Sequence, residues 1–205
     1  MKKLADLAAA VILMLFILSA AVTLTLVFQP LYRHDVQKLN LAEQTGYSEE
    51  EIMENYNALI AYNVSPFIKE LEFPTLAMSE EGRIHFEEVK AIFQLFLWMF
   101  LVTALASAII TAWKTKRGQY GYLKLAGILT LIVPTICGAL VAVNWERAFV
   151  LFHEIAFAND YWLFDPVTDP VITILPDAFF LHCAVMIMLL VAAGAAVCFA
   201  AGVCK

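Results

Sequence analysis

The chain alternates long apolar stretches with polar segments. Four stretches are almost wholly apolar, and each is close to the roughly 20 residues that a helix needs to cross a bilayer; they cover residues 4–28, 89–113, 122–143 and 179–203. The pattern therefore predicts an all-α integral membrane protein with four transmembrane helices, organised as one membrane domain over residues 1–205.

Composition agrees with this prediction, because 62% of the residues are hydrophobic and soluble domains are closer to half apolar. The first apolar stretch also has features of a cleaved signal peptide, since Lys2 and Lys3 precede it and Ser19 opens a short small-residue motif. However, the apolar core of a signal peptide has roughly 7–15 residues, and this stretch is longer. We therefore predict a retained helix.

Basic residues indicate how the helices are oriented. Lys2 and Lys3 precede the first helix, several basic residues occupy the turn 114–121, and Lys205 ends the chain. The positive-inside rule then predicts that both termini and this turn are cytoplasmic. Of the 19 acidic residues only Asp6 falls on that side. The outer surface is therefore acidic, which argues against nucleic acid or an anionic headgroup patch as a partner.

The two outer loops, residues 29–88 and 144–178, contain structure of their own. Ser48 and Glu51 fit a capping box, and the apolar residues that follow at helical spacing predict an amphipathic helix over 49–62. Together these loops are expected to form a helical extracytoplasmic cap. Its other predicted elements are a short extended piece over 67–76, a helix over 144–157, a short strand or dip over 171–175, and a start of the last helix at Pro176.

Candidate chemistry gathers in residues 152–170, where a histidine, an asparagine and four acids lie among Phe, Trp and Ile. A polar cluster on an apolar bed at the edge of a membrane indicates a site for a lipidic substrate. His153 belongs to this stretch, and His85, followed one turn later by Glu88, lies at the outer mouth of the second transmembrane helix. Histidine suits acid–base chemistry near neutral pH, so the two histidines are the candidate catalytic pair.

The remaining polar residues of the stretch allow several interpretations. Asn159, Asp160, Asp165 and Asp169 can cap turns, orient a histidine by accepting its N–H, or bind a metal together with the two histidines. The metal site is the least favoured of these, because no recognised ligand spacing is present.

Three other side chains allow a purely structural interpretation as well as a functional one. Arg147 can pair with a neighbouring glutamate or hold a substrate carbonyl or headgroup oxygen. Trp162 fits an interfacial aromatic belt as well as the apolar bed of the site. His182, in the last helix, is expected to pack rather than to act.

The motifs resemble those of a known family. Ser79-x-x-Gly-x-x-His85-Phe-x-Glu-Val, Phe152-His153, Phe-x-Asn159-Asp160-x-Trp162, Asp165-Pro-x-x-Asp169 and Leu-Pro-x-x-Phe-Phe180 together resemble the bacterial lipoprotein intramolecular transacylases. This resemblance covers nearly the whole chain.

The resemblance implies an enzyme of the bacterial cytoplasmic membrane with its site on the extracytoplasmic side. Its substrate would be a lipoprotein whose N-terminal cysteine carries a diacylglyceryl thioether, and the sn-2 acyl chain would move from the glyceryl oxygen to the cysteine amine. Neither a cofactor nor a metal is implied, and the partners are the lipoprotein N-terminus and membrane lipid.

The proton transfers that this reaction needs suggest a hypothesis for the role of each residue. His85 would be the base and His153 would polarise the carbonyl or protonate the leaving oxygen, although this order can be reversed. Asp160 or Asp165 would orient a histidine, and the substrate would be positioned by Asn159, Trp162, Asp169, Arg147 and Glu88.

Two other function classes fit the same residues. One is a membrane metal-binding protein or metalloenzyme that uses the His/Asp cluster, and the other is a non-catalytic sensor or assembly factor with an acidic outer surface. A transporter is disfavoured, because the middles of the four apolar stretches lack charged residues.

Overall fold

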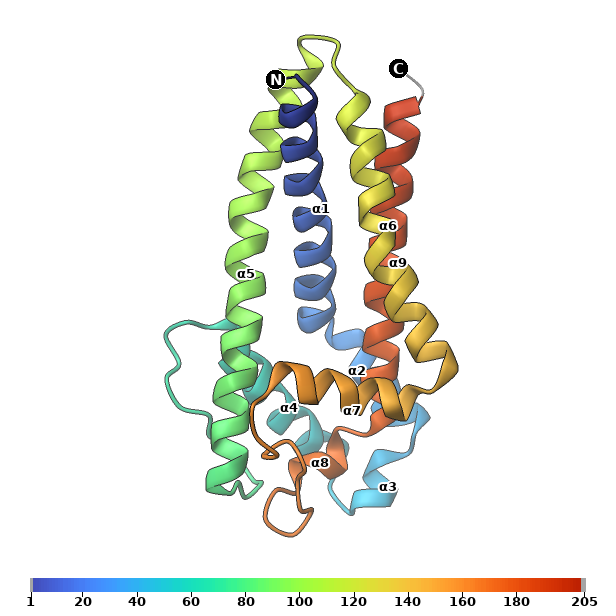
Figure 1. Cartoon of the computed structure of the whole chain (residues 1–205). Helices are drawn as coiled ribbons and strands as arrows, with labels where there is room; N and C mark the ends of the chain where they lie inside the picture. The colour runs from blue at the N-terminus through green and yellow to red at the C-terminus, as the bar shows by residue number, and fades with distance from the viewer. Residues whose placement is uncertain (1, 204–205) are drawn as a thin grey trace. The chain divides into compact units, whose positions relative to one another are not determined.

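The computed structural model describes residues 2–203. These residues form helices joined by irregular segments, and none of them forms a strand. Lys205, which the orientation argument used, lies outside the described residues. The helices are α1 (Lys2–Val27), α2 (Gln29–Lys38), α3 (Leu41–Thr45), α4 (Glu49–Val64), α5 (Glu80–Thr115), α6 (Gly121–Val143), α7 (Trp145–Ala156), α8 (Val171–Ile174) and α9 (Asp177–Val203) (Figure 1).

Four of these helices, α1, α5, α6 and α9, are long and apolar enough to cross a membrane. They coincide with the four stretches that the hydropathy pattern predicted, so the protein is an all-helical membrane protein with four candidate transmembrane helices.

The described residues form two compact units. Unit 1 holds residues 2–25, 96–145 and 185–203, and unit 2 holds residues 26–95 and 146–184. Unit 1 thus contains most of the apolar helices, whereas unit 2 contains the polar segments between them.

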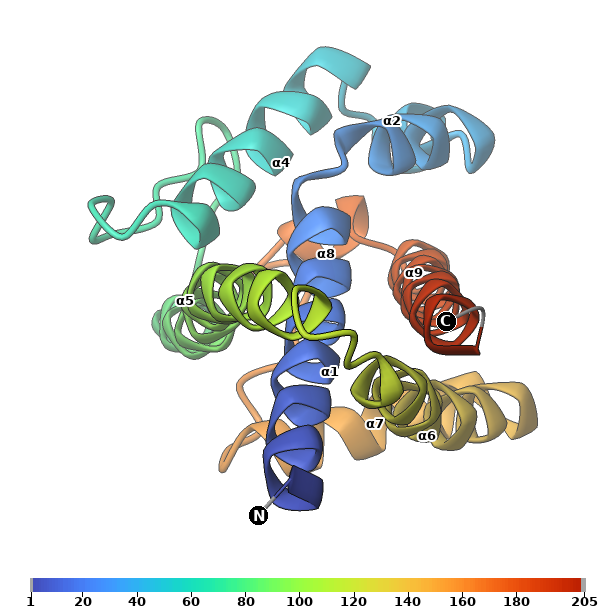
Figure 2. The same ribbon diagram turned by 90° about the horizontal axis from the view of Figure 1, so that it is seen from above.

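Small residues allow close helix packing in unit 1. A methyl group added to Gly194 of α9 would lie 2.6 Å from Cγ2 of Ile17 in α1, and one added to Gly127 of α6 would lie 2.7 Å from the carbonyl oxygen of Ala195. Helices α6 and α9 accordingly run side by side (Figure 2). Close approach at small residues is how membrane helices gain packing energy.

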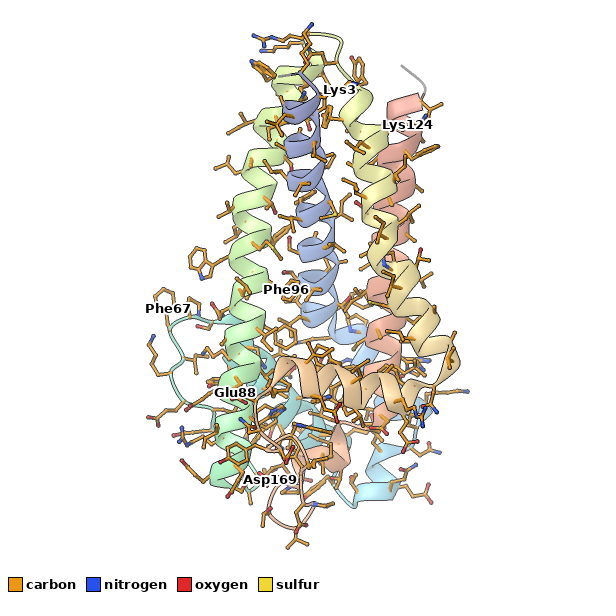
Figure 3. All side chains as sticks on the ribbon, in the orientation of Figure 1. Lys3, Phe67, Glu88, Phe96, Lys124 and Asp169 are labelled. Atoms are coloured by element: carbon orange, nitrogen blue, oxygen red, sulfur yellow. The ribbon has the colours of Figure 1, made fainter. Side chains whose placement is uncertain are left out.

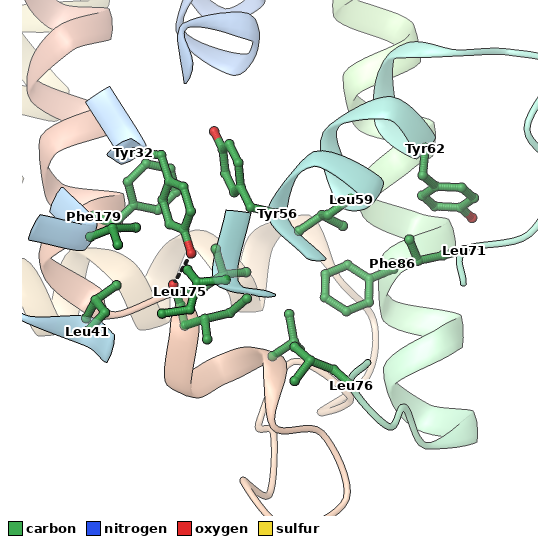
Figure 4. Packing of buried hydrophobic residues seen from close by; sticks show 14 residues of the cluster. Tyr32, Leu41, Tyr56, Leu59, Tyr62, Leu71, Leu76, Phe86, Leu175 and Phe179 are labelled. Atoms are coloured by element: carbon green, nitrogen blue, oxygen red, sulfur yellow. Dashed lines mark hydrogen bonds between the residues drawn. The ribbon is translucent and has the colours of Figure 1, made fainter. Parts of the chain in front are cut away.

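Unit 2 has a hydrophobic core of its own, made largely by aromatic and aliphatic side chains (Figure 4). The rings of Tyr32 in α2 and Tyr56 in α4 stack with centroids 3.7 Å apart, and Phe179 of α9 meets Tyr32 edge-on at 4.9 Å. The Tyr32 hydroxyl donates a 2.7 Å hydrogen bond to the carbonyl of Ile174. One buried tyrosine therefore connects α2, α4, α8 and α9.

Helix α4 confirms the amphipathic helix and its capping box. The Ser48 hydroxyl accepts the backbone N–H of Glu51, while the Glu51 carboxylate accepts the N–H of Ser48. The helix buries one face, including Ile52, Tyr56 and Leu59. The helix predicted over 144–157 is also present, as α7.

Helix α5 begins more than two turns before its predicted start. The hydroxyl of Ser79 accepts the N–H of Gly82, and the Asp169 carboxylate accepts the N–H of Ser79. These bonds satisfy donors that a helix start leaves unpaired, so α5 extends into a polar stretch that hydropathy does not mark as helical. His85 consequently lies on α5 itself.

The strand considered for residues 171–175 is wrong, because this segment is the single helical turn α8. Its N-terminal bonds run from the N–H of Ile172 to the carbonyl of Asp169 and from the N–H of Thr173 to the carbonyl of Pro170. Val171 and Ile174 are both buried, a spacing that one helical turn places on the same face. Residues 67–76 form an irregular loop.

Candidate active site

Within unit 2, His85 is surrounded by aromatic side chains. It is 5% exposed, and its ring centroid lies 4.7 Å from that of Phe157 and 5.3 Å from that of Phe164. Both phenylalanines approach edge-on from the segment that follows α7. The apolar bed predicted from the sequence therefore encloses this histidine.

His153 lies on α7 and is half-buried. Its Nδ1 is 2.8 Å from the carbonyl oxygen of Phe149, one turn earlier, and its ring lies 4.7 Å from Trp162 and 5.2 Å from Phe152. Because a carbonyl oxygen can only accept, Nδ1 carries the hydrogen and Nε2 of the neutral ring presents its lone pair.

The two histidines come together from separate helices, as the sequence predicted. Their ring centroids are 6.2 Å apart, with an angle of 29° between the planes. Phe157 touches both rings, at 4.7 Å from His85 and 5.6 Å from His153. The pair therefore offers two imidazoles to one small volume next to aromatic side chains.

The surroundings of His153 favour its neutral form. Burial lowers the pKa of His153 below the usual 6.5, and the hydrogen bond to the Phe149 carbonyl opposes that shift in part. Loss of hydration penalises the charged imidazolium. The ring is consequently neutral at pH 7 and able to accept a proton.

Glu88, which is labelled in Figure 3, forms the polar edge of the site together with Asn159. The Asn159 amide donates a 2.9 Å hydrogen bond to Oε1 of Glu88, and its own oxygen accepts the N–H of Tyr161. Two buried atoms, Oε2 of Glu88 and Nδ1 of His85, have no hydrogen-bond partner within residues 2–203. Unpaired buried polar atoms are costly, and these two side chains lie one helical turn apart on α5.

Asp169 has a structural place at the edge of the site. It is 3% exposed, and its two oxygens accept 2.8 Å hydrogen bonds from the N–H of Ser79 and the hydroxyl of Thr168. A methyl group added to Gly82 would lie only 2.2 Å from Oδ1 of Asp169. Asp169 therefore fixes the segment after α7 against the start of α5.

Three other predicted residues have different surroundings. Asp160 lies beyond the end of α7, so it does not share a helical face with His153. Its backbone carbonyl accepts the N–H of Leu163. Asp165 turns the chain by accepting the N–H of Val167. Neither carboxylate is hydrogen-bonded to a histidine in the described part of the chain. Arg147 lies exposed in the first turn of α7.

The histidine that does pair with a carboxylate is His182. Its Nδ1 is 2.9 Å from both oxygens of Asp35, which is fully buried in α2. These residues are 147 positions apart. The sequence places no acid next to His182, so only the fold reveals this pair.

Within residues 2–203, no group of three or more His, Cys, Asp or Glu side chains is arranged to hold a metal ion.

Comparisons with known proteins identify the family. The family model described as lipoprotein intramolecular transacylase Lit matches residues 7–180. A comparison with curated proteins finds no match.

Solved structures of the membrane integral lipoprotein intramolecular transacylase Lit from Bacillus cereus share 35% sequence identity with this chain. One has a TM-score of 0.92 and covers 97% of this chain and 92% of its own. Two more, one with a histidine-to-arginine and one with a histidine-to-alanine mutation, have TM-scores of 0.85, cover 97% of this chain, and cover 88% and 90% of their own. The chain therefore belongs to the lipoprotein intramolecular transacylase family Lit and is an acyltransferase.

Proposed function

We propose that the enzyme moves the sn-2 acyl chain of a diacylglyceryl lipoprotein from the glyceryl oxygen to the α-amine of the N-terminal cysteine. The product is an N-acyl, S-monoacylglyceryl lipoprotein. The observation that carries this proposal is the pair of imidazoles, 6.2 Å apart between centroids, among aromatic side chains.

The main obstacle to this reaction is conformational. The amine attacks the ester carbonyl through an eight-membered ring that contains the cysteine N, Cα, Cβ and S, two glyceryl carbons, the ester oxygen and the carbonyl carbon. Holding reacting groups in position is worth up to about 7–11 kcal/mol. The aromatic side chains around the histidines would supply this grip; they are Phe152, Phe157, Trp162 and Phe164.

Protons must move in a fixed order. A free α-amine has a pKa of about 7.7–8.0, so part of it is already neutral at pH 7. After the N–C bond forms, the nitrogen loses a proton; as the C–O bond breaks, the glyceryl oxygen gains one. No external acid, base or energy source is consumed.

The tautomer of His153 suggests which of the two rings takes which role. The lone pair on Nε2 of His153 suits it to accept the proton from the amine and to return it to the glyceryl oxygen. His85, with its unpaired Nδ1, would then polarise the carbonyl. This assignment is the reverse of the first expectation from sequence.

Glu88 is proposed to hold the substrate amine. Its Oε1 is already engaged by Asn159, whereas Oε2 has no partner among the described residues. A carboxylate oxygen accepts strong hydrogen bonds from an ammonium group. The carboxylate would thus hold the substrate as an ammonium ion, which releases one proton to solvent to become the neutral amine that attacks.

The membrane orientation belongs to the same proposal. The positive-inside rule supports cytoplasmic termini, which would place the histidines on the extracytoplasmic side of the bacterial membrane. A lipoprotein N-terminus anchored in the outer leaflet would then reach the site from the bilayer.

The test uses a strain that contains only diacyl lipoproteins and expresses His85→Ala, His153→Ala or the parent enzyme. Substrate and product have the same mass, so the assay follows loss of the reactive N-terminal amine and the tandem mass spectrum of the N-terminal peptide. Loss of acid–base catalysis is expected to slow the reaction by about 10²–10⁴-fold.

His34→Ala is the matched control, because His34 is exposed on α2. It should retain parent activity. Parent-like activity in both His85→Ala and His153→Ala would refute the histidine mechanism, and a free amine with the parent enzyme would refute the acyl transfer itself.

A further inference from the structure

A hydrophobic tip stands out on the loop between α4 and α5. Phe67 is 87% exposed and Ile68 is 40% exposed, and residues 66–70 form a continuous exposed run. Figure 3 shows Phe67 at the outer edge of this loop. Large apolar side chains give a loop no hydrophobic stabilisation while they are exposed to water. The exposure of Phe67 and Ile68 therefore needs an explanation.

The loop is held in place at both ends. Tyr62, just before it, is 1% exposed and Leu71, just after it, is 6% exposed, and both belong to the core of unit 2. The exposure of Phe67 is therefore a property of an anchored loop.

Hydrogen bonds fix the loop at one level of α5. The Gln94 amide donates to the carbonyls of Asn63 and Val64, at 2.7 and 3.0 Å. The Lys90 ammonium donates to the carbonyl of Ile68 and lies 3.9 Å from the centroid of the Tyr62 ring. The tip is thus attached to the part of α5 between residues 90 and 94.

This level is where the surface of α5 changes from polar to apolar. The helix begins with Glu80, Glu81 and Arg83, whereas beyond Lys90 it presents Leu95, which is 65% exposed. Lys69 and Lys90 lie beside the apolar tip, and lysines with apolar neighbours are typical of a membrane interface.

We propose that Phe67 and Ile68 insert into the lipid bilayer, with Lys69 and Lys90 at the headgroup level. The partner is lipid, because the tip continues the apolar surface with which α5 enters the membrane. The insertion would hold α4 and the start of α5, and with it His85, at a constant depth. This role is separate from the acyl transfer and does not depend on it.

A matched reference position lies in the same unit. Val167 is 85% exposed, but its loop is tied to the first turn of α5 through Asp169 and Ser79. At about 1.5 Å per residue, this attachment lies about 17–23 Å along the axis of α5 from that of the Phe67 loop. Val167 should therefore be in water where Phe67 is in lipid.

The test is fluorine NMR of the full chain in phosphatidylcholine nanodiscs, with trifluoromethylphenylalanine replacing either Phe67 or Val167. Both side chains are exposed, so neither replacement disturbs the core. A lipid bearing a nitroxide should broaden the signal at position 67 and spare that at 167. A water-soluble gadolinium chelate should do the opposite.

Two outcomes would overturn the proposal. Equal broadening of both labels by the chelate would place the tip in water. A signal at position 67 that neither agent broadens would mean that protein, such as a second copy of the chain, covers the tip.

Discussion

Asp35 and His182 form a histidine–carboxylate pair inside unit 2. Asp35 is completely buried, and His182 is the only hydrogen-bond partner of its carboxylate in residues 2–203. We expect His182→Ala to lower the free energy of unfolding by about 2–3 kcal/mol. Removing one member of a fully buried pair costs about 3–5 kcal/mol, and the partial exposure of His182 reduces that figure.

Thermal unfolding in detergent micelles measures this effect. The double variant Asp35→Asn, His182→Ala should recover part of the loss, because it no longer buries a charge. If His182→Ala melts at the parent temperature, the pair does not stabilise the fold.

The pH response of His153 is a second prediction for a single residue. Because burial lowers its pKa, the ring should stay neutral as the pH falls through 6.5 and become protonated only at lower pH. Trp162→Ala would let water reach the ring and raise the pKa toward 6.5, so protonation would begin at higher pH. NMR titration of labelled histidine measures both values.

His34 is exposed on α2 and gives a reference signal in both proteins. A pKa of His153 that is unchanged by the substitution would contradict burial as the cause of the shift.

Sequence reasoning proposed His85 and His153 as one candidate site but did not predict the hydrogen bonds of the site. His85, His153 and the aromatic residues carry local signals, because their polarity contrasts with apolar neighbours. Hydrogen bonds between distant segments leave no such pattern. The Glu88–Asn159 bond joins residues 71 positions apart, and a backbone carbonyl engages His153 where an acid was expected.

At the scale of elements, Gly82 determines how the start of α5 meets the segment after α7. A methyl group there would come within 2.2 Å of Oδ1 of Asp169, so Gly82→Ala should displace Asp169 from the N–H of Ser79. Overpacking of this kind costs about 1–3 kcal/mol. We expect a lower melting temperature and reduced acyl transfer, because Phe157 and Phe164 precede Asp169 in the same segment.

Gly121→Ala is the control for that substitution. Gly121 also lies in the first turn of a long helix, but an added methyl group there meets no atom within 4 Å. This variant should melt and react like the parent enzyme. Equal behaviour of the two variants would show that the contact between Gly82 and Asp169 is unimportant.

Helices were predictable where the residue composition and the helical spacing of apolar residues indicate the same structure. The four long helices follow from hydropathy, and α4 follows from its capping box. By contrast, α2 is mostly polar and α8 is only four residues long. Their helical state depends on tertiary contacts, such as the hydrogen bond from Tyr32 to the carbonyl of Ile174, which no local pattern contains.

At the scale of the whole molecule, membrane orientation is the property that basic residues predict. The turn between α5 and α6 contains Lys116 and Arg117, whereas the segment between α7 and α8 contains Asp160, Asp165 and Asp169. Since basic residues are retained on the cytoplasmic side, a cysteine placed at Gln119 should be shielded from a membrane-impermeant maleimide in intact cells. A cysteine at Val167 should react with it.

This experiment needs a background in which the four native cysteines are replaced, and lysed cells provide the control, since both positions should react there. The outcome bears directly on the mechanism. Val167 belongs to the loop that Asp169 ties to α5, so its labelling reports the side on which the histidines lie. Labelling at Gln119 alone would place the two histidines on the cytoplasmic side, where a lipoprotein anchored in the outer leaflet cannot reach them. The proposed acyl transfer would then require a different route for the substrate.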